Sequence, residues 1–273
     1  MSATIEAAQP RAQHKKPSRG GIGGALLALG ALLLKFFKLL LIPLKLLKFA
    51  KFGTTIATMA LTTWLYAGLF GLRFAAGFVL LIFLHEMGHA AAMKLCGLRA
   101  GAPVFIPFFG AFIALKDQPR DVLTEAKIAI AGPLVGAAAA AACLIPWRAT
   151  GHPLWLVLAN MGFFLNLFNL IPFGPLDGGR TVGAISRGFW IVGLVMVVGA
   201  ILVFHNWFLL IIVLLAVPYL RGQRERPPGY YDIPAAARAA VGLLYFGLAA
   251  ALGVAMMLSG EQIALIRHAP ATP

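Results

Sequence analysis

Long apolar segments are the feature of this sequence that most restricts how the chain can fold. Each is continuous in its apolar character rather than alternating, and the clearest cover residues 54–72, 74–95, 125–147, 154–170 and 237–258. In lipid every backbone N–H and C=O must be bonded within the chain, which a continuous apolar segment of about 20 residues achieves as a helix. Because 60% of the 273 residues are hydrophobic and only 12% are charged, a soluble domain is excluded. We therefore expect an all-α polytopic membrane protein with about six to seven transmembrane helices.

The first 52 residues are predicted to lie outside the membrane helices. Residues 1–21 are polar and basic, which is typical of a disordered tail. Residues 22–52 place four lysines in one sector of a predicted helix, as in an amphipathic helix that lies on an anionic membrane surface. Those lysines are Lys35, Lys38, Lys45 and Lys48. A true span over residues 22–44 is the alternative.

The segment from residue 97 to residue 124 differs from its neighbours. Glycine and proline interrupt short apolar pieces such as residues 104–106 and 111–113. This pattern favours a short β-hairpin or a re-entrant element after the second span. The membrane domain as a whole is assigned to residues 53–259, and residues 260–273 are assigned to a C-terminal tail.

The basic residues predict an orientation. If the N-terminus is cytoplasmic, successive crossings place nearly all of the 23 Lys and Arg residues on the cytoplasmic side, and only Arg73, Arg148 and Arg267 on the other. Such asymmetry is the positive-inside pattern of membrane proteins. It accounts for the formal net charge of +14 without a nucleic-acid partner. We expect a multi-pass protein of the cell membrane, with a bacterial inner membrane as the default.

The second apolar segment contains His85-Glu86-Met87-Gly88-His89, which is an H-E-x-x-H pattern. Two histidines four residues apart lie on one face of a helix, so both imidazoles can reach a single metal ion. The glutamate beside the first histidine is then placed to take a proton from a metal-bound water. Unpartnered, each of these polar groups would cost several kcal/mol in lipid. The pattern therefore predicts a metal site, with chance occurrence as the alternative.

A tetrahedral zinc site with one open position needs a third protein ligand, and Asp177 is the candidate. The second and fourth spans run in the same direction, which places Asp177 at the same depth as the two histidines. Pro172 and Pro175 precede it and Gly178-Gly179 follow it, so a helix is predicted to break there. In the alternative interpretation Asp177 is an interfacial helix cap with Arg180 as its partner.

Asn169 lies shortly before that break. A side-chain amide there can hydrogen-bond a substrate carbonyl or a developing oxyanion. An interhelical hydrogen bond is the alternative role. Asn160 and Asn166 are predicted to be structural, and Cys96 and Cys143 to be packing residues.

Together these motifs resemble those of the site-2 protease family of intramembrane metalloproteases. Residues 169–178 fit that family's N-x-x-P-x-x-P-x-D-G element in full, and Ala131-Gly132-Pro133 and the segment around Phe108-Phe109-Gly110 resemble further family features. The similarity covers about residues 75–190 and is to a compact form without a PDZ domain. It implies one zinc ion bound by His85, His89 and Asp177. It also implies that Glu86 is the general base and that Asn169 holds the substrate or its oxyanion.

The resemblance implies a zinc-dependent endopeptidase that cleaves a single-span membrane protein within the bilayer. Apolar pieces of the 102–114 segment are predicted to pair with the extended substrate by strand addition. Two alternatives are an inactive scaffold of the same fold and a membrane metal transporter. A transporter needs polar groups along a whole path, and the far-side halves of these segments have few. The oligomeric state and the identity of the substrate do not follow from the sequence.

Overall fold

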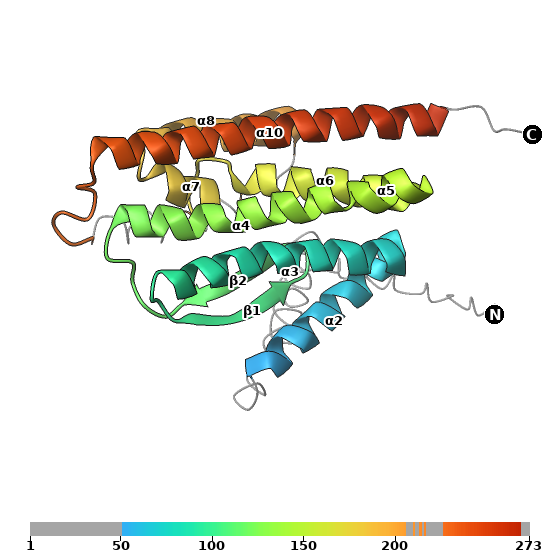
Figure 1. The fold of residues 1–273 in the computed structure, drawn as a ribbon, viewed down its shortest axis with the longest axis horizontal. Coiled ribbons are helices and arrows are strands. Elements are labelled where there is room, and N and C mark those ends of the chain that lie inside the picture. Colours follow the sequence, from blue (N-terminus) through green and yellow to red (C-terminus); the bar gives the residue numbers. More distant parts are fainter. Residues whose placement is uncertain (1–50, 206–209, 211–212, 215, 217–225, 269–273) are drawn as a thin grey trace, which may run out of the picture. The chain divides into compact units, whose positions relative to one another are not determined.

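The computed structural model describes residues 51–205, 210, 213–214, 216 and 226–268, drawn in colour in Figure 1. The predicted tail and nearly all of the amphipathic helix lie outside this set. The chain divides into two compact units, at residues 1–49 and 50–273, and only the second is described below.

The described residues are mostly helical, with one small sheet. The helices are α2 (Lys51–Phe70), α3 (Leu72–Leu95), α4 (Val122–Ala142), α5 (Leu144–Thr150), α6 (Pro153–Asn169), α7 (Asp177–Val182), α8 (Phe189–Phe204) and α10 (Ala235–His268). Three stretches are long and apolar enough to cross a membrane, namely α3, α4 with α5, and α10, whereas α6 and α8 are shorter apolar helices. The helical fold class is confirmed, and spanning length is found for three of the six to seven expected crossings.

Element boundaries differ from the predicted ones where local chemistry decides them. The turn expected at Arg73 falls at Gly71, whose φ of 82° is a left-handed conformation that glycine adopts without strain. Helix α4 begins at Val122 rather than residue 125, because the Asp121 side chain caps it by accepting a hydrogen bond from Thr124 N–H at 2.7 Å. Helix α10 continues past residue 259 to His268, which makes most of the expected C-terminal tail helical.

The predicted hairpin is present. Strands β1 (Ala100–Ile106) and β2 (Gly110–Leu115) pair antiparallel, with Phe105 opposite Ala111 and Val104 opposite Phe112. At the turn Phe108 has a φ of 68°, and its N–H donates to Tyr66 Oη at 2.9 Å. The tip of the hairpin is therefore attached to helix α2.

Helix α2 also covers the outer edge of β1. Thr55 Oγ1 donates to the carbonyl oxygen of Pro103 at 2.8 Å, and Phe105 N–H donates to Thr58 Oγ1 at 3.3 Å. These bonds occupy backbone groups of β1 that face away from β2. Consequently β2 is the strand whose outer edge is not covered by α2.

Helices α3, α4 and α6 approach one another at small residues. A Cβ on Gly88 of α3 would lie 2.4 Å from the Ala131 carbonyl oxygen of α4, and one on Gly162 of α6 would lie 2.7 Å from Ala140 Cβ. Helices α4, α6 and α10 share a buried apolar cluster that includes Phe163 and Leu252. As expected, Asn160 is structural: its amide donates to Met256 O and Ser259 Oγ, both at 2.8 Å, and joins α6 to α10.

Candidate metal centre

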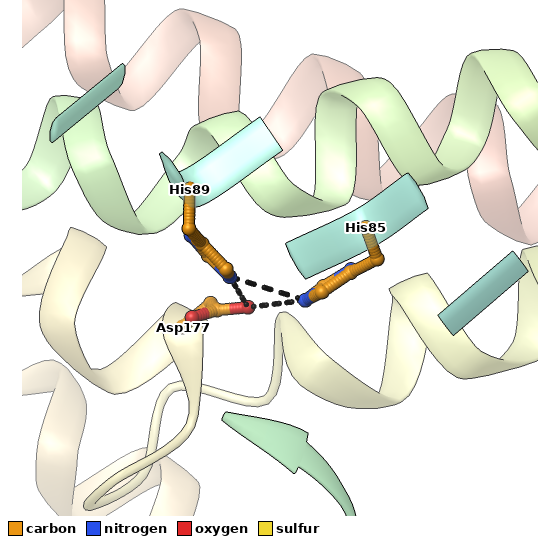
Figure 2. Close-up of side chains that lie close together, drawn as sticks. All are labelled: His85, His89 and Asp177. Atoms are coloured by element: carbon orange, nitrogen blue, oxygen red, sulfur yellow. Dashed lines mark hydrogen bonds and ion pairs between the residues drawn. The ribbon is translucent and has the colours of Figure 1, made fainter. Parts of the chain in front are cut away.

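The structure brings His85, His89 and Asp177 together. Both histidines come from α3 and the aspartate is the first residue of α7, and the three side chains point toward one another (Figure 2). Nε2 of His85 and Nε2 of His89 lie 3.1 and 3.2 Å from Asp177 Oδ2, and 3.2 Å from each other. All three residues are buried. Residues 88 positions apart in the sequence thus meet at one point.

The hydrogen bonds of the two rings determine which nitrogen carries the proton. Nδ1 of His89 lies 2.8 Å from the carbonyl oxygen of Ile128, and Nδ1 of His85 lies 2.8 Å from Oδ1 of Asn166. Carbonyl and amide oxygens only accept, so in both rings Nδ1 is the donor. In the neutral rings each Nε2 therefore presents a lone pair to the other Nε2 and to Asp177.

Three electron-pair donors that face one another need a cation between them, either a proton or a metal ion. Two imidazole nitrogens and one carboxylate oxygen form a ligand set of catalytic zinc sites that keep an open position. For ligands about 2.0 Å from a tetrahedral zinc ion, neighbouring ligand atoms lie about 3.3 Å apart. The separations of 3.1 to 3.2 Å among the three atoms are close to that value. The residues therefore fit a zinc ion.

Gly132 gives His89 the space that its ring needs. A Cβ at this position of α4 would lie 2.2 Å from His89 Nε2 and 2.4 Å from its Cε1. Any larger residue would enter the volume of the imidazole. The Ala-Gly-Pro sequence at residues 131–133 thus has a direct role in admitting the ligand side chain between α3 and α4.

The chain folds back on itself to place Asp177. Gly178 lies so close to the carbonyl oxygen of Leu170 that a Cβ there would be 2.1 Å from it. Two side chains from other helices hold the same segment: Tyr245 Oη of α10 donates to Leu170 O, and Trp190 Nε1 of α8 donates to Gly179 O at 2.7 Å. The residues on either side of Asp177 are therefore fixed by α8 and α10.

The structure does not support the alternative role for Asp177 as a helix cap. Leu176 is the N-cap of α7, and Asp177 Oδ2 faces the histidines. Arg180 makes an ion pair with Glu125 of α4 at 3.5 Å. The Glu125 carboxylate also accepts from Arg226 Nη2 at 3.1 Å and from Tyr230 Oη at 2.5 Å. Burial and the nearby Glu125 carboxylate raise the pKa of Tyr230, so its hydroxyl stays a donor.

Glu86 is buried in the same turn of α3 as the two histidines. Asn169 is half-buried, and its amide donates to Leu165 O of its own helix at 3.1 Å. The structure thus leaves the substrate-binding role of Asn169 as a prediction. Within the described residues no second group of three His, Cys, Asp or Glu side chains has ligand atoms this close together, and Cys96 and Cys143 are free thiols outside the cluster.

Asn166 contacts His85 at the centre, although the sequence predicts only a structural role for it. The available signal was an amide in an apolar helix, and three asparagines of α6 share that signal. Only the packing of α6 against α3 shows that Asn166 is the one in contact with His85.

The fold and the site define a helical membrane protein with a candidate metal centre, and comparisons with known proteins agree with that class. Residues 73–149 match the model of peptidase family M50. The chain is 32% identical over 161 residues to the zinc metalloprotease MJ0392 of Methanocaldococcus jannaschii, a match that covers 56% of this chain and 45% of that protein. It is 33% identical over 108 residues to Rip3 of Mycobacterium tuberculosis, which is also named as a zinc metalloprotease, covering 37% of this chain and 27% of Rip3.

The chain is therefore similar to peptidase family M50 over residues 73–149, the part that contains the His85 to His89 motif. Its matches cover less than half the length of these relatives.

Proposed function

We propose that this protein is a zinc-dependent intramembrane endopeptidase of the site-2 protease type. The observation that carries the proposal is the convergence of His85 Nε2, His89 Nε2 and Asp177 Oδ2 at 3.1 to 3.2 Å in a buried position. Zinc metalloproteases among its relatives support the same reaction class. The three convergent residues would hold the zinc ion.

When bound, zinc supplies the Lewis acidity that activates a water molecule and polarises the scissile carbonyl. The carboxylate of Glu86 accepts the proton of that water and returns it to the leaving amine. The hydrogen bonds at both Nδ1 atoms hold the rings so that Nε2 stays directed at the ion. Asn169 is proposed to bind the substrate carbonyl or its oxyanion from the end of α6.

The proposed substrate is a single-span membrane protein, whose helix must unwind locally because its carbonyls are otherwise hydrogen-bonded. An extended segment satisfies its backbone by adding to a free strand edge. Because α2 occupies the outer edge of β1, the outer edge of β2 is the one proposed to receive it. The side chains of Phe109 and Phe112 are about half exposed beside this edge and provide apolar contact.

Glu86→Gln tests the proposal. The amide cannot accept the proton, whereas the three proposed ligands are untouched. We expect zinc content equal to that of the wild type and loss of proteolysis. The measurement is proteomics of membrane fragments in cells that make the wild-type or the variant chain, together with zinc analysis of both purified proteins.

Remnants of single-span proteins should accumulate only with the variant. Identical fragments in both strains, with zinc present in both proteins, would contradict the peptidase assignment and favour an inactive scaffold. A wild-type protein that is active without bound zinc would show that proteolysis does not require the metal.

A further inference from the structure

His85 is held by a side chain from another helix. Oδ1 of Asn166, on α6, lies 2.8 Å from His85 Nδ1 across the α3–α6 contact. Asn166 is 1% exposed, so no bulk water competes for this bond. The other histidine is held by a backbone carbonyl, which no substitution removes. His85 is therefore the ligand whose orientation depends on a replaceable side chain.

The second hydrogen bond of Asn166 fixes which end of its amide faces the ring. Nδ2 donates to the Gly162 carbonyl oxygen of its own helix at 2.7 Å. A carbonyl oxygen can only accept, so the NH₂ group must be on that side. The amide oxygen is then turned to His85, where it can only accept the Nδ1 proton. Nε2 is left with its lone pair directed at His89 and Asp177.

Helix α4 leaves room for this arrangement at Gly136. A Cβ there would lie 2.1 Å from Asn166 Oδ1 and 2.7 Å from its Nδ2. The amide therefore fills the space above a glycine, and any side chain at position 136 displaces it. Two positions on two helices, Asn166 and Gly136, thus act on the same hydrogen bond.

We propose that Asn166 is a positioning residue of the metal centre, which holds His85 in the tautomer and the ring orientation that present Nε2 to the ion. The inference rests on the proposed role of His85 as a zinc ligand. Residues that hydrogen-bond the second nitrogen of a ligating imidazole make the ring more basic and fix its orientation. Loss of such a residue typically weakens metal binding about 10- to 100-fold. Asn166 acts through His85 and is not itself a ligand.

The first test is the zinc dissociation constant of the full-length protein, measured in detergent by competition with a chelator. Asn166→Ala should weaken zinc binding about 10- to 100-fold. Asn160→Ala is the matched control, because Asn160 lies on the same helix and bonds only to α10 in the described contacts. It should leave the zinc dissociation constant unchanged.

A double-mutant cycle with Gly136→Ala separates positioning from general damage. Gly136→Ala displaces the amide and should weaken zinc binding in the wild-type background. In the Asn166→Ala background no amide remains to be displaced, so the same change should have no further effect. Additive effects would show that the two positions act separately and would overturn the inference.

The outcomes distinguish a failure of the proposed function from a failure of the positioning role of Asn166. A wild-type protein that binds no zinc would refute the proposed function itself. A wild type that binds zinc, with Asn166→Ala binding it equally well and losing only thermal stability, would leave the function intact and refute the positioning role.

Discussion

At the scale of single residues, the candidate centre depends on two oxygen atoms that can only accept hydrogen bonds. The Ile128 carbonyl and the Asn166 amide oxygen leave both Nε2 atoms free to bind a cation. Sequence spacing alone predicted His85, His89 and Asp177, because an i, i+4 pair and a broken helix are readable patterns. Spacing did not separate Asn166 from Asn169, since both lie on α6 before the break and only the contact with α3 distinguishes them.

Gly132→Ala tests the space allotted to His89. The added methyl group would lie 2.2 Å from Nε2, so the ring must turn away from Asp177. We expect at least a tenfold loss of zinc affinity and a loss of about 1–3 kcal/mol of stability from overpacking. Zinc competition and thermal unfolding measure the two effects.

Gly247→Ala on α10 is the control, because a Cβ there meets no atom within 4 Å. It should change neither the zinc affinity nor the thermal stability appreciably. Equal zinc affinity in the Gly132 variant and the control would show that the close approach of α4 is not needed for metal binding.

At the scale of elements, the sequence predicted which segments are helical and which form a hairpin. Their junctions were less predictable, because they depend on single contacts such as the Asp121 cap and the left-handed Gly71. The covering of β1 by α2 is a tertiary feature that no local pattern shows. It matters for the proposed function because the outer edge of β2, which α2 does not cover, is the edge proposed to receive an extended substrate.

Ile113→Pro tests that edge. Ile113 pairs with Pro103, whose carbonyl faces α2, so the Ile113 N–H faces away from β1. Proline removes an outward N–H and is tolerated on edge strands. We expect at least a tenfold loss of cleavage of the membrane fragments identified with Glu86→Gln, with zinc content unchanged.

Ile113→Val keeps the N–H and should retain cleavage. Full activity of the Ile113→Pro variant would exclude strand addition at β2.

At the scale of the whole molecule, the described helices have two distinct ends. The start of α3, helix α5 and the end of α10 lie together at one end, and the hairpin and α7 lie at the other (Figure 1). The first group contains Arg73, Arg148 and Arg267. These are the basic residues that the charge pattern placed on the far side, so the arrangement of the helices fits the predicted topology. Which end faces the cytoplasm remains a prediction.

Cysteine labelling tests the orientation. Single cysteines are introduced by Thr150→Cys or Lys116→Cys in a chain whose Cys96 and Cys143 are replaced by alanine. Both positions are exposed, and they belong to opposite ends, because Thr150 is the last residue of α5 and Lys116 directly follows β2 of the hairpin. In intact cells a membrane-impermeant thiol reagent should label position 150 and spare position 116. Labelling of position 116 alone would reverse the orientation.

Two imidazoles and one carboxylate, those of His85, His89 and Asp177, are proposed to hold a zinc ion between α3 and α7. X-ray absorption at the zinc edge of the purified full-length protein tests it most directly. We predict one zinc per chain with only nitrogen and oxygen ligands, two of them imidazoles, and loss of the bound zinc in Asp177→Ala. Sulfur in the coordination shell, or a zinc site unchanged by Asp177→Ala, would contradict the proposed set of ligands.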